Sequence, residues 1–294
     1  MHKSKLTSDT KKEAVLLTII ASSLWGTSFP VIKIGLQYMD AYTFVFLRFS
    51  FALLIMLVVV LLTKNITFNF NKRLILFLGF TNGVAYLLQY IGMFYTSASK
   101  ASLLVNLTVV WVALLSPLVI KEQVGRKKLT GVIISILGII LVTTNLDFQS
   151  FSTGEIFGDI IVIMAGMIWA LFIIYNKPLV TGSKNMLQSL TWLLLFTMIP
   201  LLPVVPFSTT TFLSLPWEAW MVIIYTAVFC WIIPYLLWSK GLKNISPLTS
   251  AVILLNEIIV AVTISTLILR ESLTAISGIG AFLIIIAIIL VSYR

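Results

Sequence analysis

The sequence has few charged residues and almost none of the residues that build soluble catalytic sites. Charged side chains make up 10% of its 294 residues and hydrophobic ones 60%, whereas soluble domains are about half apolar and about a quarter charged. His2 is the single histidine and Cys230 the single cysteine. These counts exclude a histidine dyad, a histidine-rich metal site and an internal disulfide.

The usual enzyme and nucleotide motifs are also missing. The chain has no GxGxxG loop, no GxxxxGK[ST] loop, no GxSxG elbow and no pair of acids inside an apolar run. We therefore expect no enzyme activity, no cofactor, no bound metal and no ATP-driven transport by this chain alone. The net charge of +10 does not indicate nucleic-acid binding, because the basic residues lie in short segments between apolar runs.

Long apolar runs dominate what is present. Each is about 20 residues long, which is the length of a helix that crosses ~30 Å of hydrocarbon. The pattern predicts an all-α polytopic membrane protein embedded in a lipid bilayer, with a first helix that is retained rather than cleaved as a signal peptide. The ten predicted spans are 14–36, 41–62, 74–96, 101–120, 129–145, 157–176, 186–206, 217–238, 247–268 and 273–292.

The distribution of basic residues predicts the orientation. With the N-terminus in the cytoplasm, sixteen of the twenty lysines and arginines fall on the inner side, and the outer loops contain only Lys100 and Arg270. Positive charge is retained on the cytoplasmic side of membranes. We expect a multi-pass protein of the cell membrane with both termini in the cytoplasm.

The two halves of the chain resemble each other. Residues 24–36 align with 168–180, which matches Trp25 to Trp169, and residues 131–142 align with 280–291. Five spans per half is an odd number, so the second half has to be inverted in the membrane. The sequence thus predicts an inverted 5+5 repeat, with helices 1–5 in residues 1–145 and helices 6–10 in residues 146–294. Inverted repeats suit transporters that work by alternating access.

Five motifs in order give the chain a family resemblance. They are WGTSFPVIK in the first span, FLRF in the second, YTSASKASLL before the fourth, SPLTSAVILLNE at the start of the ninth, and the closing GIILV and AIILV of the two halves. With these motifs the chain resembles the ten-helix members of the EamA family of the drug/metabolite transporter superfamily.

The resemblance implies an exporter or permease of small metabolites. It also implies a central cavity lined by helices 1, 3, 4, 6, 8 and 9. The family commonly has a proline directly after the acid of the ninth helix, whereas here Ile258 follows Glu257. Members differ widely in cargo, so the resemblance does not identify the substrate.

Glu257 lies close to the middle of the ninth span. A carboxylate at that depth costs a few kcal/mol or more unless it faces a polar cavity or a partner. A proton-coupled exporter needs a group that changes its charge during the cycle, and Glu257 suits that role. The alternative is structural, with the acid holding helices together. Asn256 beside it is either a ligand contact or a hydrogen bond between helices.

Polar and aromatic side chains repeat at helical spacing on several spans and predict the walls of a cavity. We take Trp25, Tyr86, Tyr90, Asn106 and Trp169 as candidate substrate contacts, together with Asn256 and Glu257. For any single aromatic residue, ordinary helix packing is the alternative. The stripes are Ser22, Trp25 and Phe29; Asn82, Tyr86, Gln89 and Met93 with Tyr90 beside them; Ser99, Ser102 and Asn106; and Ala165, Trp169, Phe172 and Asn176.

Arg48 lies about two turns into the second span. It either pairs with a helix end or headgroup, or joins Glu257 in coupling or charge recognition. Gly26 and Pro30 in the first span and Pro234 in the eighth are candidate hinges, because glycine and proline weaken helical hydrogen bonding.

Three functions follow from these features. The first is a secondary active transporter that exports amino acids or related amphipathic solutes, with protons as the possible coupling ion. The second carries organic cations such as quaternary amines, with Glu257 as the counter-charge and aromatic rings beside it. The third is a membrane subunit that transports nothing. The sequence leaves open a monomer or a homodimer.

Overall fold

The computed structural model describes residues 8–63, 71–96, 98–144, 146, 156–269 and 274–292. Within these ranges the chain is helical and has no β-strand, so the predicted all-helical class is confirmed. The elements are α1 (Ser8–Gly26), α2 (Ser28–Gly35), α3 (Ala41–Leu62), α4 (Lys72–Tyr95), α5 (Ala98–Asn106), α6 (Thr108–Ile120), α7 (Arg126–Thr144), α8 (Ile156–Gly182), α9 (Met186–Leu201), the 3₁₀ turns Leu202–Phe207 and Phe212–Ser214, α10 (Trp217–Ala227), the π-helical turn Val228–Ile232, α11 (Ile233–Asn244), α12 (Pro247–Leu254), α13 (Asn256–Leu269) and α14 (Ala275–Ser292).

Seven helical segments of the described chain are long and apolar enough to cross a membrane. They correspond to the first, second, third, sixth, seventh, eighth and ninth predicted spans. The fourth and tenth coincide with the shorter apolar helices Leu104–Ile120 and Gly278–Val291, and the fifth coincides with α7. The chain is therefore a multi-pass membrane protein.

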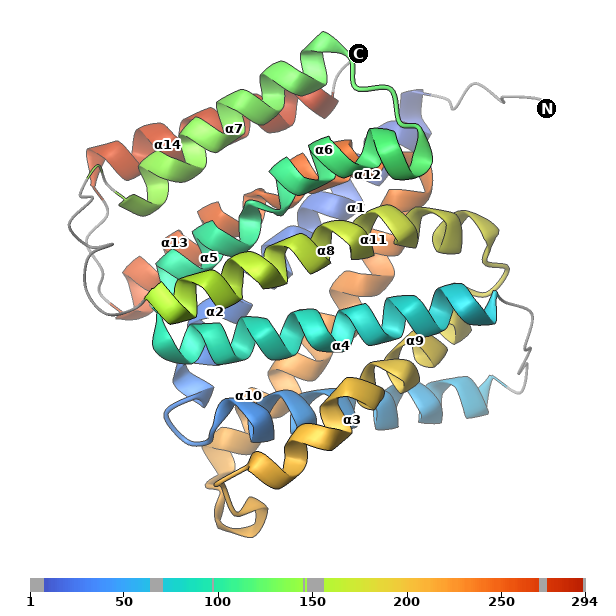
Figure 1. Cartoon of the computed structure of the whole chain (residues 1–294), viewed down its shortest axis with the longest axis vertical. Coiled ribbons are helices and arrows are strands. Elements are labelled where there is room, and N and C mark those ends of the chain that lie inside the picture. The colour runs from blue at the N-terminus through green and yellow to red at the C-terminus, as the bar shows by residue number, and fades with distance from the viewer. Residues whose placement is uncertain are drawn as a thin grey trace.

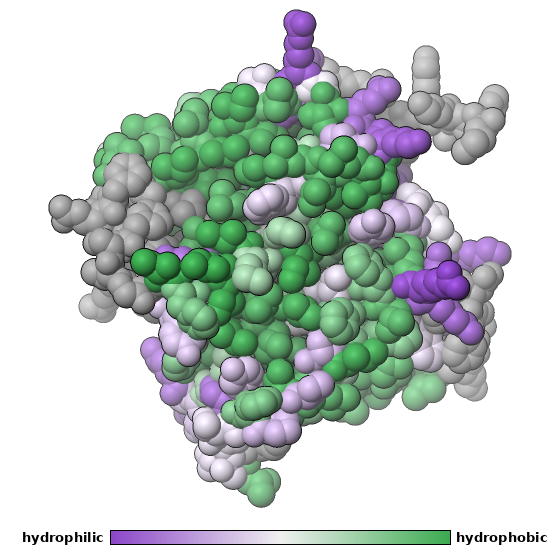
Figure 2. Space-filling model, in the orientation of Figure 1, coloured by the Kyte–Doolittle hydropathy of each residue, from purple (hydrophilic) through white to green (hydrophobic). Residues whose placement is uncertain are grey.

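The outer surface fits that environment. Large apolar side chains point outward, and Leu118 and Leu267 are 78% and 75% exposed. Figure 2 shows hydrophobic residues covering the middle of one face, with hydrophilic residues near its edges. Such an exposed apolar surface needs lipid to cover it.

The two halves of the chain interleave in the core. α4 packs along α8 and α9, while α1 packs along α11 and α13. α5 and α6 contact α8, and α12 contacts α6. α7 and α14 lie side by side at one end of the molecule (Figure 1). The central core therefore requires helices from both halves.

Three apolar segments are interrupted near their middle. α1 gives way to α2 at Thr27, α5 to α6 at Leu107, and α12 to α13 at Leu255. Pro30 has no N–H and cannot bond to the carbonyl of Gly26, which accounts for the first interruption. The third interruption, at Leu255, occurs although Ile258 stands where the family commonly has a proline. Interruptions of this kind free backbone groups that other parts of the protein must satisfy.

The fourth irregular segment is the π-helical turn before Pro234. Pro234 has no N–H to donate to the carbonyl of Cys230. Nη2 of Arg48 donates to that carbonyl at 2.9 Å, and Nη1 donates to the hydroxyl of Tyr90. Arg48 is 1% exposed, and its guanidinium carbon lies 4.9 Å from the centre of the Tyr86 ring. The buried arginine thus satisfies the backbone group that the proline leaves open.

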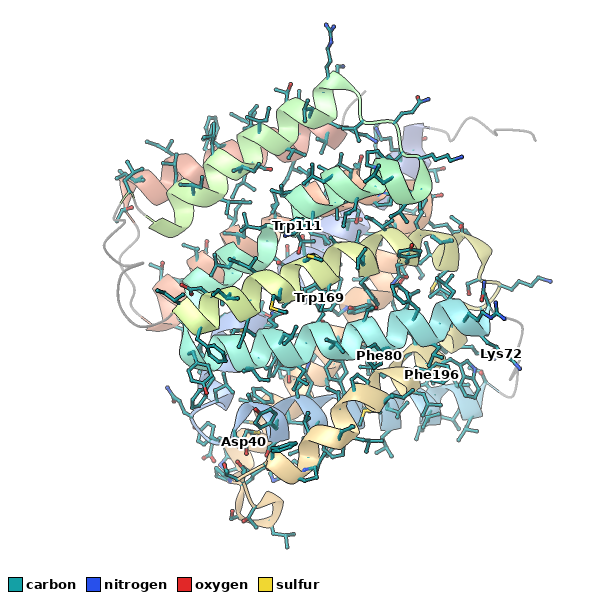
Figure 3. The ribbon with its side chains drawn as sticks, in the orientation of Figure 1. Asp40, Lys72, Phe80, Trp111, Trp169 and Phe196 are labelled. Atoms are coloured by element: carbon teal, nitrogen blue, oxygen red, sulfur yellow. The ribbon has the colours of Figure 1, made fainter. Side chains whose placement is uncertain are left out.

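Asp40 joins the halves at one edge of the molecule (Figure 3). It accepts hydrogen bonds from the backbone N–H of Thr43 at the start of α3 and from the N–H groups of Thr209 and Thr210, which precede α10. Desolvation acts to raise the pKa of this carboxyl, but the hydrogen bonds outweigh it and lower the pKa to about 2. Asp40 is therefore an ionised N-cap that also anchors a loop of the second half.

Glu122, in the turn between α6 and α7, makes a second polar contact between the halves. It forms an ion pair with Lys128 at 2.7 Å and accepts a hydrogen bond from Ser116. Lys128 also donates to the hydroxyl of Ser246, the N-cap of α12, at 3.0 Å. Desolvation opposes ionisation of Glu122, but the bonds from Lys128 and Ser116 lower its pKa.

Glycine allows α4 and α9 to approach closely. A Cβ atom at Gly83 would lie 2.5 Å from the carbonyl oxygen of Thr197 and 2.5 Å from Cγ of Pro200. Small residues permit such backbone contact between membrane helices. The interface therefore has no room for a side chain at this position.

Arg48→Met is expected to lower the free energy of unfolding by at least about 2 kcal/mol, because two buried acceptors lose their donor. Adding Pro234→Ala to Arg48→Met supplies a backbone N–H near the carbonyl of Cys230 and should recover part of the loss. Thermal unfolding of the purified single and double variants measures both effects. Wild-type stability of Arg48→Met would contradict this account of the arginine.

Gly83→Ala should destabilise the protein by about 1–3 kcal/mol through overpacking against α9. Gly278→Ala in α14 is the matched control, because a Cβ atom there meets nothing within 4 Å. Alanine favours helix over glycine, so the control is expected to be neutral or stabilising in the same thermal assay. Equal effects at both positions would refute the close contact.

Candidate functional site

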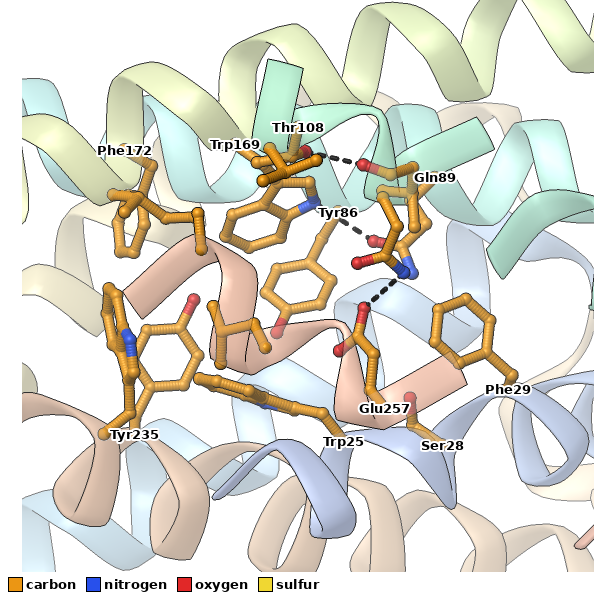
Figure 4. Close-up of a pocket in the computed structure, with 17 residues that line it drawn as sticks. Trp25, Ser28, Phe29, Tyr86, Gln89, Thr108, Trp169, Phe172, Tyr235 and Glu257 are labelled. Atoms are coloured by element: carbon orange, nitrogen blue, oxygen red, sulfur yellow. Dashed lines mark hydrogen bonds between the residues drawn. The ribbon is translucent and has the colours of Figure 1, made fainter. Parts of the chain in front are cut away.

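A pocket that is partly open to the outside lies between the two halves (Figure 4). The empty space among its lining residues, open solvent included, is about 680 Å³. Its walls come from the six spans that the family resemblance named, because the lining residues lie on α1, α2, α4, α5, α6, α8, α11, α12 and α13. The described lining residues are Trp25, Ser28, Phe29, Tyr86, Gln89, Val105, Asn106, Thr108, Val109, Trp169, Phe172, Ile173, Tyr235, Trp238, Ala251, Leu254 and Glu257.

Aromatic rings form much of the wall and contact one another edge to face. The ring centres of Tyr86 and Trp169 are 4.7 Å apart, those of Trp169 and Phe172 are 5.4 Å apart, and those of Trp25 and Tyr235 are 5.2 Å apart. Edge-to-face pairs are a favourable arrangement of aromatic side chains. The wall is therefore apolar and packed before any solute enters.

Polar residues behind the wall hold these rings in place. The hydroxyl of Tyr235 donates to Oδ1 of Asn82 at 2.8 Å, and Nδ2 of Asn82 donates to Thr197 at 3.0 Å. Nε1 of Trp238 donates to the hydroxyl of Ser250 at 2.8 Å. Each ring thus has an apolar face toward the cavity and a polar atom fixed in the helix packing.

Glu257 and Asn106 are hydrogen-bonded to each other in the wall of the cavity. Asn106 is the last residue of α5, and Glu257 lies in the first turn of α13, so each stands beside a helix interruption. Nδ2 of Asn106 donates to Oε1 of Glu257 at 2.7 Å and to the carbonyl of Ser102 at 2.8 Å. A helix N-terminus favours negative charge. The interruptions therefore bring a carboxyl and an amide together inside an apolar wall.

The backbone of α1 passes close to that acid. A Cβ atom at Gly26 would lie 2.6 Å from the carbonyl oxygen of Glu257 and 2.7 Å from Cβ of Val260. Gly26 therefore sets the position of α1 against the first turn of α13. The other two residues predicted as hinges also lie at irregular helices, Pro30 in α2 and Pro234 in the second position of α11. Their role in movement stays a prediction.

Four of the predicted contacts, Trp25, Tyr86, Asn106 and Trp169, line the cavity with Glu257. The other three charged or polar candidates, which lie behind the wall, are Tyr90, Asn256 and Arg48. Tyr90 is fully buried and bonds to Arg48. Asn256 faces α1, where its Nδ2 donates to the hydroxyls of Ser22 and Ser23 at 3.1 and 2.9 Å.

Ser28, Thr108, Tyr235 and Trp238 also line the cavity and were not among the predicted contacts. For Tyr235 and Trp238 the sequence contains a signal in its helical periodicity. Trp231, Tyr235 and Trp238 follow steps of four and three on the eighth span, the same periodicity that identified stripes on other spans. Ser28 and Thr108 give no comparable signal, because single small polar residues are frequent in membrane helices.

Comparisons with known proteins support one family. The model of the EamA-like transporter family matches residues 12–144 and 156–293. A protein of Archaeoglobus fulgidus named "Uncharacterized transporter" is 27% identical over 245 residues, covering 81% of this chain and 82% of that protein. A Salmonella typhimurium protein named "Probable amino-acid metabolite efflux pump" is 24% identical over 286 residues, covering 91% of each chain.

A solved crystal structure has the same fold. It matches with a TM-score of 0.79 over 95% of this chain and 96% of its own, at 12% sequence identity. At that identity the likeness concerns the arrangement of the helices and carries no information on cargo.

Proposed function

Because the chain belongs to the EamA-like transporter family, we propose that it is a secondary active transporter that exports small metabolites through the cavity. The cargo we propose is amino acids or related amphipathic solutes. The observation that carries the proposal is the position of Glu257, a carboxyl at the wall of an aromatic cavity that both halves of the chain build. The name of the Salmonella relative supports the same class of cargo.

We further propose ten membrane helices in an inverted repeat, with the halves at 1–145 and 146–294. The repeat pairs α1 and α2 with α8, α3 with α9, α4 with α10 and α11, α5 and α6 with α12 and α13, and α7 with α14. If the two halves exchange places, the contact between α4 and α8 becomes the contact between α11 and α1. The α3–α9 and α7–α14 contacts are unchanged, because each joins the two members of one pair. All four contacts occur, as a two-fold axis requires.

Alternating access follows from such a repeat. The polar contacts of Asp40 with residues 208–210 and of Lys128 with Ser246 each join the two halves. Movement between open states requires such contacts to break and form again. The interruptions at Thr27, Leu107 and Leu255 give the lining helices places to bend.

Glu257 is the coupling group in this proposal. Its carboxyl either carries a proton or is ionised and pairs with a cationic amine of the cargo. Because the two states exclude each other, outward movement of cargo is linked to inward movement of a proton. We also propose that the protein lies in the cell membrane with both termini in the cytoplasm, which the charge asymmetry of the loops supports.

A second candidate, transport of organic cations, is favoured by the charge of the wall. Among the described lining residues Glu257 is the single charged side chain. Arg48 lies behind the wall, and Nζ of Lys33 donates to the carbonyl of Met93 at 2.6 Å. An acid among aromatic rings suits a cation through charge pairing and cation–π contact.

Glu257→Gln should abolish export driven by a proton gradient, with a loss of at least about tenfold, because the amide cannot change its charge. Transport of labelled amino acids in liposomes containing the purified chain, with and without a pH gradient, measures the effect. Glu13→Gln, at an exposed position on α1, is the control and should transport normally. If Glu257→Gln and Glu257→Ala both keep normal transport and pH dependence, the coupling role is wrong.

A competition experiment separates the two classes of cargo. In the same liposomes, phenylalanine represents the zwitterions and benzyltrimethylammonium the quaternary amines. Inhibition by phenylalanine supports the amino-acid proposal. Inhibition by the quaternary amine alone, about tenfold or more in apparent affinity and lost in Glu257→Gln, supports the cation proposal.

A further inference from the structure

Gln89 presents a hydrogen-bond donor to the cavity. Nε1 of Trp169 donates to Oε1 of Gln89 at 3.1 Å. An indole nitrogen is a donor only, so this bond identifies the oxygen end of the amide and assigns Nε2 to the other end. No residue in the described part of the chain accepts a hydrogen bond from that Nε2. Because Gln89 lines the cavity, the N–H groups are available to a solute.

Asn106 and Glu257 present acceptors to the same space. The carbonyl of Ser102 is an acceptor only, so the amide nitrogen of Asn106 is the atom that bonds to it, and the same nitrogen donates to Oε1 of Glu257. Oδ1 of Asn106 and Oε2 of Glu257 then have no donor among the residues that the structure describes. Figure 4 shows the bonds of Gln89 and Glu257 at one end of the cavity and the ring of Tyr235 toward the other.

These atoms are complementary to one chemical pattern. An ammonium group donates to Glu257 and Asn106, a carbonyl or carboxylate oxygen next to it accepts from Gln89, and an apolar side chain lies against the rings. An α-amino acid or its amide has this pattern, whereas a simple amine lacks the acceptor. A buried donor left without an acceptor costs binding free energy, so the cavity discriminates between the two.

We propose that Gln89, oriented by Trp169, is the residue that recognises the acceptor oxygen of the cargo, while Glu257 and Asn106 bind its amine. The inference rests on the proposed function only in requiring that amine-bearing solutes enter the cavity. Trp169 acts as a positioning residue, because its N–H fixes which end of the amide faces the solute.

The test compares L-phenylalanine amide with phenethylamine, which has the same ring and amine but no carbonyl group. Their dissociation constants are measured by direct titration of each ligand into the purified full-length chain. The wild type should bind the amide about 3- to 10-fold more tightly, the size of effect expected for one hydrogen bond. Gln89→Leu should reduce that ratio to about one by weakening the amide and sparing phenethylamine.

Two further variants separate recognition from structure. Trp169→Phe keeps an aromatic ring but removes the N–H that orients the amide, so the ratio should fall to an intermediate value. Gln37→Leu, at an exposed position outside the cavity, should leave both affinities unchanged. If Gln89 served only to support Trp169, Gln89→Leu would weaken both ligands equally and preserve the ratio.

Each remaining result has a defined meaning. A wild-type ratio near one, with both ligands bound, overturns the role of Gln89 and leaves the transporter proposal standing. Failure of the wild type to bind either ligand overturns both the role of Gln89 and the amine-bearing class of cargo. Failure of the coupling proposal is detected separately, because it depends on transport by the Glu257 variants.

Discussion

Backbone groups inside a membrane must find partners within the protein, and this constraint links the irregular helices to the cavity. Thr27 donates to the carbonyl of Leu24 at 2.7 Å where the first span is interrupted. Thr108 bonds to the carbonyls of Val105 and Gly166 beside the interruption at Leu107. Polar side chains thus bond to backbone carbonyls beside two of the interruptions, and both interruptions adjoin residues that line the cavity.

The same constraint explains the contacts of Arg48. Arg48 is a buried cation, which is unfavourable in an apolar environment unless it is bonded. Pro234 removes the N–H that an α-helix would direct at the carbonyl of Cys230, and Arg48 donates to that carbonyl. Its charge also lies over the rings of Tyr86 and Tyr90. Arg48 thereby connects the second span to the eighth, one from each half.

Polar and aromatic groups are unevenly distributed over the wall of the cavity. Its wall is largely aromatic, and the Asn106–Glu257 and Trp169–Gln89 hydrogen bonds lie at one end of it (Figure 4). A solute with one polar end and one apolar body fits this division, because it can place ammonium and acceptor groups at one end and bury the remainder against the rings. Because aromatic surface accommodates different apolar groups, the proposed transport assigns specificity mainly to the polar end of the solute.

The sequence by itself determined the helical class, the membrane environment, the family resemblance and the candidacy of Glu257, because hydrophobic run length, charge placement and the cost of an intramembrane acid are local properties. Helical periodicity also selected Trp25, Tyr86 and Trp169. Tertiary structure alone decided that Asn256 bonds to α1 while Asn106, 151 positions away in the chain from Glu257, bonds to the acid. Tertiary structure also decided that Arg48 bonds to the carbonyl of Cys230 and that the oxygen of the Gln89 amide bonds to Trp169, which leaves the amide nitrogen as a donor. Which side chains meet depends on the relative rotation and the interruptions of separate helices, and these are set by packing between helices rather than by the residues of any one of them.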